Sequence, residues 1–105
     1  MTAKYDDMFY YLSKHNILKI KDAAILDEEI IYFQNIKGSL YYLSIGRKNE
    51  YTNWSWSCKK QLVKMLKNYS NCLVYTDIDS NINTMTKLLL SQGFKQLSFN
   101  EFYKD

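Results

Sequence analysis

Apolar residues recur every three or four positions in three segments of the chain, the spacing of a helix with one buried face. The middle segment begins with a serine, Ser57, and the third is followed by a glycine, Gly93. Serine often caps the start of a helix, and glycine often closes its end. We therefore predict three helices, over Ala3–Lys14, Ser57–Tyr69 and Ile82–Gln92.

Runs rich in β-branched and aromatic residues lie between these helices and predict strands. Glu29–Ile36 and Leu40–Arg47 are separated only by a short break that contains Gly38. Two such runs with a short glycine-containing connection predict a β-hairpin. Three other segments complete the set of predicted strands: Ile17–Ile20, Leu73–Ile78, and Phe94–Tyr103 as one strand or a bent pair.

The order of these elements is helix, strand, hairpin, helix, strand, helix, strand. Such an order predicts an α+β fold in which helices pack on a mixed sheet. A chain of 105 residues has the length of one domain, so we expect residues 1–105 to form a single unit. A strand–helix–strand step between parallel neighbours should be right-handed.

Composition is that of a globular protein, with 47% apolar and 24% charged residues, which excludes a disordered chain. No segment approaches the roughly 18 continuous apolar residues of a membrane helix, so no membrane partner is expected. The N-terminus lacks a signal-peptide pattern, and we expect a cytoplasmic protein. Cys58 and Cys72 form no metal-type pair, so they are predicted to be free core thiols, and no metal site is expected.

Residue usage and charge each add one point. Lys, Asn, Ile and Tyr are abundant and proline is absent, which indicates an A/T-rich genome such as that of a bacterium, virus or phage. The net charge of +3 conceals a basic middle, because residues 37–67 contain seven Lys or Arg and one acidic residue, Glu50. Within it, Lys60, Lys64 and Lys67 are predicted to form a solvated helix face. Asp77 and Asp79 are predicted to be turn and cap residues.

The last third of the chain, LVYTDIDSNINTMTKLLLSQGFKQLSFNEFYK, resembles the C-terminal half of the GNAT family of N-acetyltransferases. In both, a buried strand leads through an Asn-containing turn to a helix that ends in Gly-Phe, here Gly93-Phe94. An aromatic strand with a lysine follows, here Phe102-Tyr103-Lys104. The resemblance spans about residues 29–104. It implies a central, mostly antiparallel sheet with two main packing helices and an N-terminal helix, and it implies acetyl-CoA as cofactor.

The sequence departs from the family at the places that carry the chemistry. The family binds the pyrophosphate of acetyl-CoA with a glycine-containing turn at a helix start, where bare backbone N–H groups approach the phosphates. Residues 54–59 here read WSWSCK and contain no glycine. The position of the family's general acid, a Tyr, is Leu89, and Leu40–Arg47 contains no Glu to act as general base. We therefore predict no catalytic residue.

Our first hypothesis is a non-catalytic GNAT-like protein without a cofactor, which binds another macromolecule, in the first place a protein, as viral or phage accessory and structural proteins do. Aromatic and basic residues near the middle helix are the predicted partner surface, provided that they are exposed. These residues are Arg47, Lys48, Tyr51, Trp54 and Trp56.

Two alternatives remain. The first is a divergent acetyl-CoA-dependent N-acetyltransferase in which the start of the middle helix holds the pyrophosphate through Ser55, Ser57, Lys59 and Lys60. The second is a nucleic-acid-binding module, in which bases stack on the tryptophans and basic side chains neutralise phosphates.

Overall fold

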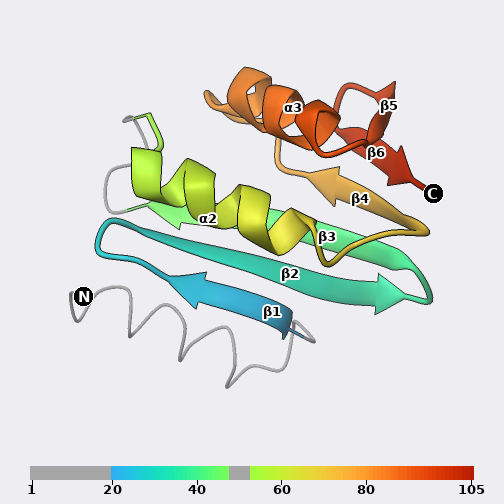
Figure 1. Cartoon of the computed structure of the whole chain (residues 1–105), viewed down its shortest axis with the longest axis horizontal. Coiled ribbons are helices and arrows are strands. Elements are labelled where there is room, and N and C mark those ends of the chain that lie inside the picture. Colours follow the sequence, from blue (N-terminus) through green and yellow to red (C-terminus); the bar gives the residue numbers. More distant parts are fainter. Residues whose placement is uncertain (1–19, 48–52) are drawn as a thin grey trace.

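The computed structural model describes residues 20–47 and 53–105, which form six strands and two helices (Figure 1). The helix predicted over Ala3–Lys14, and the candidate partner residues Lys48 and Tyr51, lie outside the described residues. The elements in chain order are β1 (Ile20–Ile25), β2 (Glu29–Lys37), β3 (Leu40–Arg47), α2 (Trp56–Leu66), β4 (Cys72–Thr76), α3 (Ile82–Ser91), β5 (Lys95–Ser98) and β6 (Glu101–Lys104).

All six strands belong to one sheet in the order β1-β2-β3-β4-β6-β5. Every neighbouring pair is antiparallel except β3 and β4, which are parallel and are connected through α2. The predicted α+β fold with a mixed, mostly antiparallel sheet is therefore confirmed in the described part of the chain. The last strand, β6, lies between β4 and β5, so the C-terminal end of the chain is held inside the sheet.

The predicted hairpin is confirmed as β2 and β3, joined by Gly38 and Ser39. Gly38 has a φ of +55°, a conformation that suits glycine in a tight turn. The side-chain amide of Asn35 donates to the carbonyl oxygen of Gly38 at 2.9 Å and braces the turn. Phe94–Tyr103 is also confirmed as a bent strand pair, β5 and β6.

Both helices cover the same face of the sheet (Figure 1). Alternate residues of β2 and β3 point to that face. Together with residues of β4 and β6, they form one core with the apolar sides of α2 and α3. The core is a single cluster that includes Ile31, Phe33, Leu43, Ile45, Cys58, Leu62, Met65, Leu66, Val74, Met85, Leu89, Phe94 and Phe102. Leu89 is therefore a fully buried core residue.

The structure corrects three details of the predicted elements. The N-cap of α2 is Ser55 and not Ser57, because the Ser55 side chain accepts from the backbone N–H of Cys58 at 3.1 Å, three residues further on. The N-cap of α3 is Asn81, while the Asp79 carboxylate accepts from the Asn81 N–H at 2.8 Å. Strand β1 covers Ile20–Ile25 and pairs with β2, in a segment for which the sequence pattern predicted no element beyond Ile20. Residues 17–19 of the strand predicted over Ile17–Ile20 lie outside the described residues.

The predicted closure of α3 by glycine is confirmed. Gly93 has a φ of +90°, and the backbone N–H of Phe94 donates to the carbonyl of Leu89 at 3.1 Å. This is the left-handed termination that glycine favours after a helix. It turns Phe94 into the core directly after the helix ends.

Candidate functional site

The start of α2 is bound to a carboxylate from the sheet. Glu29, the first residue of β2, is only 3% exposed. One of its oxygens accepts the backbone N–H of Ser55 at 2.7 Å, and the other accepts the Ser55 hydroxyl at 2.9 Å. A helix N-terminus carries unpaired N–H groups and a partial positive charge that favour an anion. In this chain that anion is an internal side chain.

The two tryptophans on either side of Ser55 have opposite environments. Trp54 is 4% exposed and belongs to the core, whereas Trp56 is 78% exposed. Because Ser55 is held to β2, the residue before it is drawn against the sheet, while the first residue of α2 faces outward. The assignment of Trp54 to an exposed partner surface was therefore wrong, and Trp56 meets the condition of exposure.

Arg47 is also not a surface anchor. Its side chain is 5% exposed at the end of β3, and its Nη1 lies 3.9 Å from Oδ2 of Asp79 in the connection between β4 and α3. Pairing between the parallel strands β3 and β4 stops at Leu43 and Thr76, so Arg47 lies beyond the last paired residues. The expected exposure of Arg47 was wrong, because the side chain links the diverging ends of these strands.

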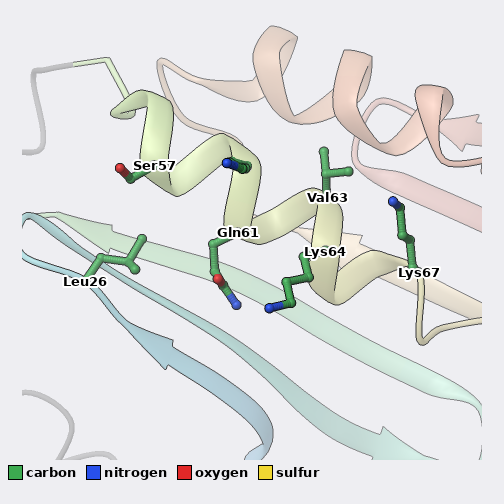
Figure 2. Close-up of a pocket in the computed structure, with 7 residues that line it drawn as sticks. Leu26, Ser57, Gln61, Val63, Lys64 and Lys67 are labelled. Carbon is green, nitrogen blue, oxygen red and sulfur yellow. The ribbon is translucent and has the colours of Figure 1, made fainter.

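An open hollow of about 500 Å³ runs along one side of α2 (Figure 2). Figure 2 shows Gln61 and Lys64 projecting from α2 toward the strands on the side where Leu26 lies. Ser57 and Lys60, two of the four residues predicted to hold a pyrophosphate, line this hollow together. Its complete lining is Leu26, Ser57, Lys60, Gln61, Val63, Lys64 and Lys67.

A second depression lies between α2 and α3. Its floor is apolar and is made by the Trp56 ring, Val63 and Leu88, while Lys59 and Lys60 stand at its rim. We call these five residues the α2–α3 groove. Lysine side chains can cover apolar surface with their methylene stems while the ammonium group stays in water. The four predicted pyrophosphate ligands do not meet at one place: Ser55 and Ser57 line a depression beside Glu29, Ser57 and Lys60 line the hollow, and Lys59 and Lys60 line the groove.

The outer surface of the helix layer is basic. The segment from the start of α2 to its C-cap carries four lysines, α3 carries one, and neither helix contains an acidic residue. The predicted solvated face is confirmed, since Lys60, Lys64 and Lys67 are all exposed. The lysines of this layer are Lys59, Lys60, Lys64, Lys67 and Lys87.

Both cysteines are buried and free, as predicted. Burial, assisted by the nearby Glu29 carboxylate, raises the pKa of Cys58 to about 12. Cys58 is therefore a protonated thiol at neutral pH and is unsuited to act as a nucleophile, although it lies near a helix start. In residues 20–47 and 53–105, no group of three or more His, Cys, Asp or Glu side chains is placed to hold a metal ion.

Sequence reasoning missed a polar cluster on the sheet face opposite the helices. Asp77 accepts hydrogen bonds from the Tyr42 hydroxyl and, at 2.9 Å, from the Ser44 hydroxyl. The Tyr42 ring lies 5.0 Å from that of Tyr75, and burial together with the bond to Asp77 raises the pKa of Tyr42. Tyr42 and Ser44 are two positions apart on β3, so their side chains lie on one face, and Asp77 directly follows β4. The sequence could have revealed this cluster only if the parallel pairing of β3 and β4 had been known.

When the chain is compared with known proteins, no family model, curated protein or solved structure matches it. Neither α2 nor α3, the helices of the described ranges, combines the length and apolar character that a bilayer-spanning segment requires.

Proposed function

We propose that this chain is a small non-catalytic domain of GNAT-like architecture that binds another protein. The observation that carries the proposal is the carboxylate of Glu29 at the start of α2. A pyrophosphate at the same helix start would compete with this carboxylate for the Ser55 N–H, and two anions so close repel one another. The helix terminus that would hold the cofactor already has its anion.

Other features of the fold support the same proposal. A single parallel pair, β3 and β4, brackets α2, and the Gly93-Phe94 helix end is followed by strands that complete a mostly antiparallel sheet. These features agree with the family resemblance. Leu89, at the position of the family's acid, lies in the core and carries no exchangeable proton, which argues against the family's usual chemistry.

Residue usage supports a viral or phage accessory or structural protein in the cytoplasm of its host as the setting of this function. An abundance of residues with A/T-rich codons is the basis for that part of the proposal. The binding role itself depends on the exposed Trp56 and the basic helix layer.

Isothermal titration calorimetry with acetyl-CoA tests the proposal. We expect no binding heat up to about 1 mM ligand, which corresponds to less than about 4 kcal/mol of binding free energy. A parallel assay for acyl transfer to small amines and to lysine peptides should show no product. Micromolar binding together with transfer to any amine would establish an enzyme and refute the proposal.

The divergent N-acetyltransferase remains the second candidate, because Ser57 and Lys60 line one hollow and could hold phosphates away from Glu29. In that case the double variant Lys59→Gln/Lys60→Gln should raise the dissociation constant of acetyl-CoA. Lys95→Gln on β5, outside the helix layer, is the matched control. A cofactor that binds equally well to both variants would place its pyrophosphate elsewhere on the molecule.

A further inference from the structure

We propose that the α2–α3 groove is a docking site for an acidic amphipathic helix of a partner protein. This inference rests on the proposed binding function and gives it a surface and a partner chemistry. It starts from the largest exposed apolar side chain of the helix layer, Trp56, which is 78% exposed beside an apolar floor. Exposed tryptophans with such surroundings are frequent anchors of protein interfaces.

The spacing of the groove residues suits a helical ligand. Trp56, Lys59, Lys60 and Val63 occupy positions i, i+3, i+4 and i+7 of α2, which form one stripe. Trp56 and Val63 are seven residues apart, or about 10 Å along the helix axis. Leu88 of α3 closes the other side. A partner helix with apolar side chains on successive turns of one face could cover both Trp56 and Val63.

Charge selects an acidic partner. Lys59 and Lys60 are the charged residues that line the groove, and neither α2 nor α3 contains a carboxylate that could offset them. Lys64 and Lys67 line the hollow and add positive charge nearby without facing the groove. Opposite charge across an interface accelerates association and rejects partners of like charge. A partner helix with Asp or Glu flanking its apolar stripe therefore complements both the floor and the rim of the groove.

The same surface suits nucleic acid less well. Single-stranded nucleic acid is bound by several aromatic rings that stack successive bases, whereas Trp56 is the one aromatic residue of α2 and α3. Trp54 and Arg47, which would have extended an aromatic and basic patch, are both buried. The helices also contain no arginine, the side chain best suited to bidentate phosphate contacts.

A designed peptide pair provides the test. The probe is a synthetic helical peptide of about 16 residues with leucines at i, i+4 and i+7 flanked by glutamates, a length of about four helical turns. Its control replaces every Glu by Gln. Trp56 emission reports docking, because an exposed indole shifts its emission to shorter wavelength when a partner covers it. We expect the acidic peptide to bind at least about tenfold more tightly than its control in low salt, with the difference shrinking as salt is added.

Variants of the full chain locate the site. Trp56→Ala, followed with a fluorescein-labelled peptide, should weaken binding by about 10- to 30-fold. Phe99→Ala removes another exposed aromatic side chain, from the β5–β6 turn, and should leave affinity unchanged. Lys59→Gln/Lys60→Gln should weaken binding and flatten its salt dependence, while Lys95→Gln should do neither. Thermal melting of each variant verifies that the fold is retained.

Three results would overturn the proposal. The first is equal affinity for the acidic and neutral peptides, and the second is unchanged binding in a folded Trp56→Ala variant. The third is preferential, Trp56-dependent binding of a 20-nucleotide oligo-dT or of vesicles rich in phosphatidylserine, which would assign the groove to nucleic acid or to a membrane surface. None of these results depends on acetyl-CoA, so failure of the docking site and failure of the non-catalytic assignment are distinguishable.

Discussion

Ser55 separates a buried tryptophan from an exposed one, and its hydrogen bonds explain why. Its hydroxyl accepts from Cys58 and donates to Glu29, and its N–H donates to the other oxygen of the same carboxylate. Residues 54–56 are thereby fixed with Trp54 toward the core and Trp56 toward solvent. The sequence does not reveal this difference, because the two tryptophans are two positions apart and share Ser55 as a neighbour.

At the residue scale, Cys58 should make the protein sensitive to alkali. Burial raises the pKa of Cys58 from its ordinary value of 9.0 to about 12, so the folded state holds the thiol proton above the pH at which the unfolded chain releases it. This contribution to stability is fully present below pH 9 and is lost as the pH rises toward 12. The free energy of unfolding should fall by about 1.4 kcal/mol per pH unit for this group.

Urea unfolding of the wild type and of Cys58→Ala between pH 7 and 11 measures this effect. The variant should be less stable at pH 7 because it leaves a small cavity, but its stability should decline less steeply above pH 9. Buried tyrosines with raised pKa values, such as Tyr42 and Tyr69, keep part of the slope in both proteins. An identical slope in wild type and variant would show that Cys58 ionises freely in the folded state.

At the element scale, the sequence pattern predicted those helices, strands and turns that contacts between neighbouring residues determine. The β2–β3 hairpin follows from two apolar runs and Gly38, and the end of α3 follows from Gly93. The start of α2 does not follow in the same way, because two serines compete for the N-cap. The choice of Ser55 depends on Glu29, which is 26 residues earlier in the chain. Strand β1 was likewise indistinct, since its pairing partner rather than its own composition specifies it.

Glu29 should stabilise the junction between β2 and α2. Glu29→Ala leaves the Ser55 N–H without its carboxylate and should lower the free energy of unfolding by about 1–3 kcal/mol. Ser55→Ala removes the helix cap and should cost about 1 kcal/mol. Lys37→Ala changes an exposed side chain at the far end of β2 and should stay within about 0.5 kcal/mol of wild type.

Chemical denaturation with far-UV circular dichroism measures these three free energies. The double variant Glu29→Ala/Ser55→Ala should lose less than the sum of its parts, because both substitutions break the same hydrogen bonds. A strictly additive pair, or a Glu29→Ala protein as stable as wild type, would mean that the carboxylate does not hold the helix start.

At the scale of the whole molecule, the class of fold was within reach of the sequence and the working surface was not. Alternating strands and helices predicted an α+β domain with a mixed sheet. That α2 and α3 share one face, and that their outer side carries lysines without a carboxylate, depends on the strand order and on the crossover through α2. The same is true of the Asp77 cluster, whose members meet only because β3 and β4 are parallel neighbours.

The central claim is that the Glu29 carboxylate, and not a cofactor phosphate, occupies the start of α2. A titration of ¹⁵N-labelled protein with acetyl-CoA, followed at the backbone amides of Ser55 to Cys58, tests it most directly. We expect these resonances to stay in place up to about 1 mM acetyl-CoA, the limit of weak binding. Saturable micromolar shifts centred on the Ser55 and Trp56 amides would contradict the claim and show that the helix start receives the coenzyme.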